Sequence, residues 1–157
     1  MQEAQGSIGE PLRAFVAHKG ETTSLDKLRT FLDAIGIECL IAESEPSDGR
    51  SVEGQVTWTY EQADFAIILA TKAGVKDDKK GTQYMGLNVA DELGRARVTF
   101  RNRIILLLQQ GVEPHTNINE IVHERFSPGS MDKAFTKILR ELKNWGMIKL
   151  VKQQSKE

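Results

Sequence analysis

One carboxylate stands out among the residues that could do chemistry. Glu92 lies in the segment Leu87 to Phe100, whose apolar residues repeat at helical spacing. At about 100° per residue, Glu92 flanks the apolar residue Leu93, and Asn88 lies one turn earlier on the same face. An amide and a carboxylate presented together can hydrogen-bond the hydroxyl groups of a sugar. The alternative is that Glu92 is a solvated charge near the middle of a helix, and spacing leaves both interpretations open.

Arg50 and His18 are the next candidates. Arg50 follows Gly49 and opens a helix, where a guanidinium and free backbone N–H groups can bind an anionic ligand. The alternative is an exposed loop arginine. His18 ends a strand and can act as a general base or bind a ligand, or it can be a hydrogen-bonded structural group. Trp58 and Tyr60 can stack on a base, and the alternative is that they pack in the core or form a surface for a partner.

Metal and glycine-loop chemistry are not expected. Cys39, His115 and His123 lie far apart in the pattern and predict no metal site. None of the loops carries a Walker or Rossmann glycine fingerprint, so a phosphate cradle of that kind is not predicted. The single cysteine cannot form an internal disulfide, which suits a reducing compartment.

Five apolar runs and four helical patterns must position these residues. The predicted strands are residues 12–17, 37–42, 64–70, 103–108 and 121–126. The predicted helices are residues 25–35, 51–62, 87–100 and 131–145. Such alternation predicts parallel strands joined by right-handed crossovers, and the segments 71–86 and 111–119 are predicted to be loops.

The strand order follows from hydrophobicity. The most apolar runs, around Phe15, Ile67 and Leu106, are predicted to be central, and the second and fifth strands are predicted to be edges. The fold class is therefore α/β, a flavodoxin-like three-layer sandwich whose five-stranded parallel sheet has the order 2-1-3-4-5. Such sheets bind ligands outside the carboxyl ends of strands one and three, where the loops after the first three strands should meet Asn88 and Glu92.

Composition bounds the function classes. The chain has 157 residues, which fits one domain, with 21 Lys and Arg against 22 Asp and Glu. This balance argues against a protein that coats nucleic acid or an anionic membrane. Neither a membrane-spanning run nor a signal peptide is recognisable, so a cytoplasmic location is expected. We expect a flexible leader over residues 1–11, the domain over 12–150 and a polar tail or linker over 151–157.

Four segments resemble, in order along the chain, one bacterial family. They are Ala14 to Gly20, Glu45 to Ser51, Ala63 to Leu69 and Asn88 to Gly94. Together they are similar to the TIR-like domain of a predicted nucleotide-binding family found in Pycsar-type anti-phage effectors. The resemblance extends over about residues 12–146, and its most specific parts are the Gly-Arg pair and the Asn-Val-x-x-Glu-Leu-Gly motif.

The resemblance implies an NAD⁺ nucleosidase, an enzyme that cleaves the bond between nicotinamide and ribose, with Glu92 as its catalytic glutamate. The residues implied to frame the nucleotide are His18, Lys19, Gly49, Arg50 and Asn88. NAD⁺ is then the substrate, and no cofactor is implied. The resemblance also implies activation by self-association through the loop around Arg50, and control by a sensor domain or subunit.

Two other functions stay open at this point. One is a non-catalytic TIR module that binds a nucleotide or a partner TIR domain. The other is a nucleoside deoxyribosyltransferase-like enzyme, which uses a glutamate at a related position as a nucleophile. A response-regulator receiver has the same topology but needs an aspartate at the end of strand three, where this chain has Leu69-Ala70-Thr71.

Overall fold

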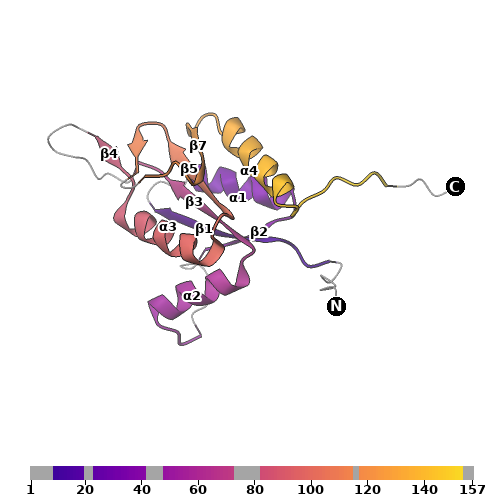
Figure 1. The fold of residues 1–157 in the computed structure, drawn as a ribbon, viewed down its shortest axis with the longest axis horizontal. Helices are drawn as coiled ribbons and strands as arrows, with labels where there is room; N and C mark the ends of the chain where they lie inside the picture. The colour runs from indigo at the N-terminus through magenta and orange to yellow at the C-terminus, as the bar shows by residue number, and fades with distance from the viewer. Residues whose placement is uncertain (1–8, 20–22, 42–47, 73–81, 115–116, 154–157) are drawn as a thin grey trace.

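The main sheet of the protein has five parallel strands (Figure 1). The computed structural model describes residues 9–19, 23–41, 48–72, 82–114 and 117–153. The five strands are β1 (Arg13–Lys19), β2 (Glu38–Leu40), β3 (Phe65–Ala70), β5 (Ile104–Gln109) and β7 (Val122–Phe126). Their order is β2-β1-β3-β5-β7. These are the five predicted strands in chain order, so the predicted arrangement 2-1-3-4-5 is confirmed.

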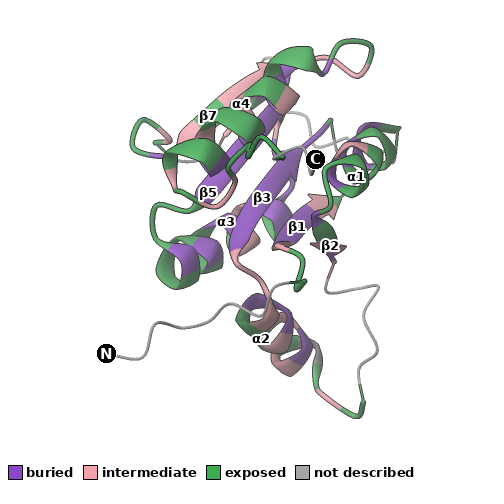
Figure 2. Cartoon of the chain, turned by 90° about the vertical axis from the view of Figure 1, so that its right-hand side faces the viewer, coloured by how far each residue is buried: buried purple, intermediate pink, exposed green. Residues whose placement is uncertain are grey.

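Two pairs of helices cover the two faces of the sheet. The helices are α1 (Thr23–Ala34), α2 (Val52–Gln62), α3 (Leu87–Phe100) and α4 (Asp132–Asn144). One core cluster joins the sheet to α1 and α4, and the other joins it to α2 and α3. Every residue of β3 and β5 is buried, and these strands lie at the centre of Figure 2. A strand covered on both faces must be apolar throughout, which is why both runs were recognisable in the sequence.

A second, smaller sheet lies in segments predicted to be loops. Strand β4 (Gln83–Tyr84) pairs in parallel with β6 (Val112–Glu113). The prediction that residues 71–86 and 111–119 are loops throughout was therefore wrong. Two-residue strands are too short to show a period of two, and they form because tertiary packing brings them together. Arg125 supports the pair, since its Nη1 donates to the Val112 carbonyl at 2.9 Å.

Some of the predicted segments lie partly or wholly outside the described residues. Residues 1–8 of the expected leader, residues 154–157 of the expected tail, and residues 20–22, 42–47, 73–81 and 115–116 lie outside the described residues. Within the described part of the chain, no helix is both long enough and apolar enough to cross a membrane.

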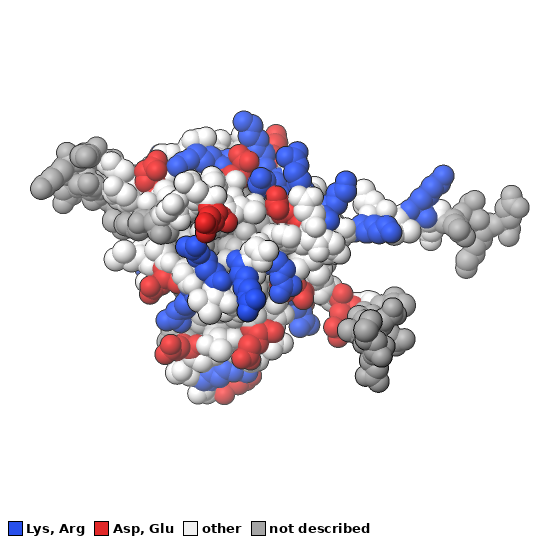
Figure 3. All heavy atoms as spheres, in the orientation of Figure 1, with Lys and Arg blue, Asp and Glu red and all other residues white. Residues whose placement is uncertain are grey.

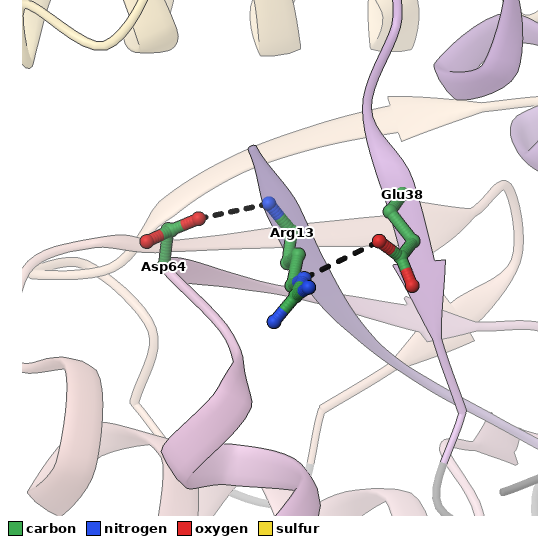
Figure 4. A network of polar contacts seen from close by, with 3 residues as sticks. All are labelled: Arg13, Glu38 and Asp64. Carbon is green, nitrogen blue, oxygen red and sulfur yellow. Dashed lines mark hydrogen bonds and ion pairs between the residues drawn. The ribbon is translucent and has the colours of Figure 1, made fainter. Parts of the chain in front are cut away.

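The amino end of β1 is held by two acidic residues (Figure 4). The backbone N–H of Arg13 donates to Asp64 Oδ2 at 2.8 Å, and the Asp64 N–H donates to the Arg13 carbonyl at 2.8 Å. The Arg13 Nε donates to Glu38 Oε2 at 3.2 Å, in a pair whose side chains are 38% and 48% exposed. Asp64 therefore fixes the register in which β1 enters beside β3.

We expect Asp64→Ala to lower the free energy of unfolding by about 1–2 kcal/mol, because a partly buried backbone donor loses a charged acceptor. Urea unfolding measures the loss. The control is Glu38→Ala, which removes the exposed ion pair and is expected to cost less than about 1 kcal/mol. A loss for Glu38→Ala that equals or exceeds the loss for Asp64→Ala would contradict this account.

Candidate functional site

Glu92 lies on the flank of α3 that faces α2. Val89 and Leu93 are 2% and 1% exposed and turn toward the sheet, while Glu92 is half-buried. Asn88, one turn earlier on the same flank, is exposed. The helix starts after Gly86, close to the carboxyl ends of the strands, so its first turns lie at the edge where ligands bind in this type of fold.

Tyr60 joins α2 to α3 at residue 92. Its hydroxyl donates to the main-chain carbonyl of Glu92 at 3.2 Å. Its ring meets Phe15 of β1 edge-on, with centroids 4.4 Å apart, and Phe100 of α3 edge-on at 5.6 Å. Tyr60 is 6% exposed. It therefore contacts the sheet, the middle of α3 and the carboxyl end of α3.

The Glu92 carboxylate acts on Tyr60 electrostatically. Burial raises the pKa of Tyr60 most, the negative charge of Glu92 raises this pKa further, and Arg95 lowers it. The phenol therefore stays protonated at neutral pH and remains a hydrogen-bond donor. Because the charges of Glu92 and Arg95 both act on a residue of α2, this flank of α3 lies near α2.

Arg50 and Gly49 lie where the chain enters α2. The Arg50 guanidinium lies over the Trp58 ring, 4.4 Å from the centroid, and its Nη1 donates to Gln55 Oε1 at 3.2 Å. Asp48 Oδ2 is 3.9 Å from the same nitrogen. Ser51 caps the helix by accepting the Gly54 N–H at 3.0 Å. Arg50 is thus held against α2 by a cation–π contact and a hydrogen bond. The alternative that it is a loop arginine without contacts to the rest of the domain does not apply.

Gly49 is required by its backbone. Its φ is +79°, and Asp48 before it has a φ of +47°. A Cβ at Gly49 would meet nothing within 4 Å, so the constraint is the left-handed conformation and not crowding.

We expect Gly49→Ala to lower the free energy of unfolding by about 1–2 kcal/mol, because a side chain is strained at this φ. Gly94→Ala is the matched comparison, because Gly94 lies inside α3 and an added Cβ there also meets nothing within 4 Å. That variant is expected to gain about 0.5–1 kcal/mol from helix propensity. Thermal or urea unfolding of both variants measures these changes. If the free energy of unfolding changes in the same direction in both variants, the backbone conformation of Gly49 is not the constraint.

His18 and Lys19 end β1 on different sides of the sheet. Ala14 and Val16 belong to the core cluster under α1 and α4, while Phe15 and Ala17 belong to the cluster with α2 and α3. Alternation along the strand puts His18 on the side of α1, and Lys19 on the side of Glu92. The His18 Nε2 is buried and has no hydrogen-bond partner among the described residues. A single ligand meets both His18 and Glu92 only by lying across the carboxyl edge of the sheet.

A match to a family model decides the family. The model describes the TIR domain of the CAP12/Pycsar effector protein, and it matches residues 13–128. The chain belongs to this TIR-domain family. The match takes in all five strands of the main sheet and the three helices α1, α2 and α3, and it identifies a TIR module of a defence-effector family.

Other comparisons add little to this result. A comparison with curated protein sequences finds no significant match. One solved structure that the TIR domain resembles is a response regulator receiver domain protein from Clostridium thermocellum. The two are 14% identical with a TM-score of 0.39, and the match covers 85% of this chain and 98% of that chain. At that score the likeness supports no argument, and the fold rests on the topology described above.

Two polar residues that sequence reasoning missed tie the strand ends of the TIR domain together. The Thr71 hydroxyl donates to the Lys19 carbonyl at 3.0 Å, which links the ends of β3 and β1. The Lys72 N–H donates to Gln109 Oε1 at 2.8 Å, which links β3 to β5. Thr71 directly follows β3 and Gln109 is the last residue of β5, and both are buried. A polar residue at the carboxyl end of an apolar run is the signal that could have revealed them.

The surface of the TIR domain carries mixed charge. Figure 3 shows Lys and Arg side chains grouped near the middle of one face, with Asp and Glu side chains around them. A hollow of about 340 Å³ at the amino ends of β5 and β7 is lined in part by Arg97, Arg101 and Glu120. Another, of about 230 Å³, lies between β7 and α4. Both hollows lie away from the carboxyl ends of β1 and β3, so neither belongs to the site around Glu92.

Proposed function

We propose that this TIR domain is an NAD⁺ nucleosidase that cleaves the bond between nicotinamide and ribose, with Glu92 as its catalytic carboxylate. The observation that carries the proposal is the placement of Glu92. It is half-buried on the flank of α3 that borders α2, its main chain is bonded to Tyr60, and its charge is close enough to raise the pKa of Tyr60. Glu92 lies within the segment that the family model matches.

The chemistry suits a single carboxylate. Nicotinamide leaves NAD⁺ as a neutral molecule, taking the electron pair of the C–N bond, so no general acid is needed to expel it. Positive charge then develops on the ribose, as in the oxocarbenium-like transition state of glycoside cleavage. A carboxylate beside the ribose stabilises that charge and can accept hydrogen bonds from the ribose hydroxyls. Water, or another group of the same nucleotide, then bonds to the anomeric carbon and gives up a proton.

The remaining proposed contacts follow from position. Asn88 lies one turn before Glu92 on the same flank and offers an amide to the sugar. Lys19 ends β1 on the same side of the sheet and is exposed, so its ammonium can meet a phosphate. Gly49 and Arg50 directly precede Ser51, the N-cap residue of α2. His18 reaches the ligand only across the carboxyl edge. No resident cofactor takes part in this scheme.

We also propose that activity requires self-association of the domain, because TIR enzymes of this kind act as assemblies. We propose that the segment around Arg50, directly before α2, forms the contact between copies of the domain. Raising the protein concentration should then increase the activity per molecule. A specific activity that is the same from dilute to concentrated protein would argue against assembly.

The test of the proposed function is incubation of concentrated protein with NAD⁺ and detection of free nicotinamide. Parallel incubations with a deoxyribonucleoside and a free base test the transferase chemistry. Release of nicotinamide supports the proposal. A protein that binds NAD⁺ or assembles but releases no nicotinamide is a binding module, and base exchange without NAD⁺ cleavage identifies a transferase.

A further inference from the structure

The hydroxyl of Tyr60, on α2, bonds to the main chain of Glu92, the proposed catalytic residue on α3. Inside an α-helix, a carbonyl such as that of Glu92 already accepts the N–H four residues on. Its second lone pair takes the Tyr60 hydroxyl at 3.2 Å. The bond joins residues 32 positions apart, and nothing in the internal hydrogen bonding of either helix requires it.

The Tyr60 ring is fixed on two sides. Phe15 lies edge-on at 4.4 Å with an interplanar angle of 87°, and Phe100 lies at 5.6 Å with an angle of 76°. Phe15 and Phe100 are 1% and 3% exposed, so neither ring can move aside without opening the core. The two rings therefore hold the Tyr60 hydroxyl in place. Through Tyr60, residue 92 of α3 is held at a fixed position relative to Phe15 of β1.

We propose that Tyr60 is a positioning residue for Glu92: its hydroxyl fixes the main chain of α3 at residue 92 and so sets the position of the Glu92 carboxylate relative to the carboxyl edge of the sheet. This inference rests on the proposed function for its catalytic consequence. Without the hydroxyl, α3 can slide or rotate slightly on the sheet, and small misplacements of a catalytic group are costly in rate.

The chain offers a matched control in the preceding residue. Thr59 is 0% exposed, and its hydroxyl donates to the Gln55 carbonyl at 2.8 Å within α2 itself. Tyr60→Phe and Thr59→Val each remove one buried hydroxyl from the same helix, but only the first removes a bond to α3. Both variants should show similar, small decreases in the midpoint of thermal unfolding.

The kinetic test separates positioning from general loss of stability. We expect Tyr60→Phe to lower kcat for nicotinamide release about 10-fold with KM nearly unchanged, and Thr59→Val to leave kcat unchanged. A Tyr60→Phe enzyme whose kcat equals that of Thr59→Val overturns the inference. Combining Tyr60→Phe with Glu92→Asp adds a second readout, since groups acting through one another give non-additive effects on kcat.

Amide hydrogen exchange gives a readout that needs no activity. We expect faster exchange in the middle of α3 in Tyr60→Phe than in Thr59→Val, and equal rates would overturn the anchoring role. If Glu92→Gln keeps full activity while exchange rises as expected, the proposed function fails and the anchor stands. If Glu92→Gln is inactive while Tyr60→Phe is normal in kcat and in exchange, only the present inference fails.

Discussion

Glu92→Gln is expected to lower the rate of nicotinamide release by on the order of 10²–10³-fold, the usual effect of removing one preorganised group that stabilises transition-state charge. Gln keeps the size of the side chain and one acceptor oxygen but not the negative charge opposite the oxocarbenium. Because Glu92 is half-buried and borders Tyr60, the charge acts where water screens it only in part. KM is expected to change little, since the charge that we propose Glu92 stabilises develops only in the transition state.

Asp91→Asn is the matched control, because it removes the same charge from the neighbouring residue. Asp91 is exposed, and helical spacing directs it away from the flank of Glu92. Its replacement should leave nicotinamide release within about twofold of the original rate, as for a surface charge screened by solvent. Equal losses in the two variants would point to a general electrostatic effect of α3 and remove Glu92 from its catalytic role.

Leu106→Ala is expected to have the largest effect on stability, a loss of about 2–5 kcal/mol in the free energy of unfolding. Leu106 is 0% exposed in β5, between the registered residues Ile68 of β3 and His123 of β7. The cavity left by the truncation cannot close easily, because strands on both sides fix the backbone. The unfolding midpoint should fall by about 5–15 °C for a domain of this size.

Leu150→Ala makes the same chemical change at a position that is 101% exposed. It is expected to change the free energy of unfolding by less than about 0.5 kcal/mol. Urea unfolding of both variants provides the comparison. A small loss in Leu106→Ala, close to that of Leu150→Ala, would mean that β5 is not the centre of the core.

Much of the fold could be predicted because its central strands are buried on both faces. The runs Phe65–Ala70 and Ile104–Gln109 are apolar at nearly every position, which distinguishes them from amphipathic helices. Gln109 is the exception, and it lies at the carboxyl end, where its side chain binds Lys72. Alternation of strands and helices then left few topologies to consider.

The contacts of the candidate site could be predicted only in part. Helical spacing placed Glu92 beside the buried stripe of α3, but spacing around one helix does not say which neighbouring helix lies against that flank. The bond from Tyr60 to Glu92 is therefore a product of tertiary packing. Side chains alternate along a strand, so His18 lies on the same side of the sheet as Val16, which is the side of α1. The sequence-based prediction grouped all residues at the carboxyl edge and did not use this alternation.

The small β4–β6 ladder has a consequence for how this protein can diversify. Residue 72 is bonded to Gln109, and on the other side of residues 73–81 strand β4 pairs with β6, with the Met85 N–H donating to the Glu113 carbonyl at 3.0 Å. The first attachment point is thus held by β5 and the second by β6, and the second lies directly before α3 begins. Changing the length of the segment between two fixed points is cheap, about 0.6 kcal/mol for each doubling. A change in the number of residues between these two points would therefore leave the helix that bears Glu92 where it is.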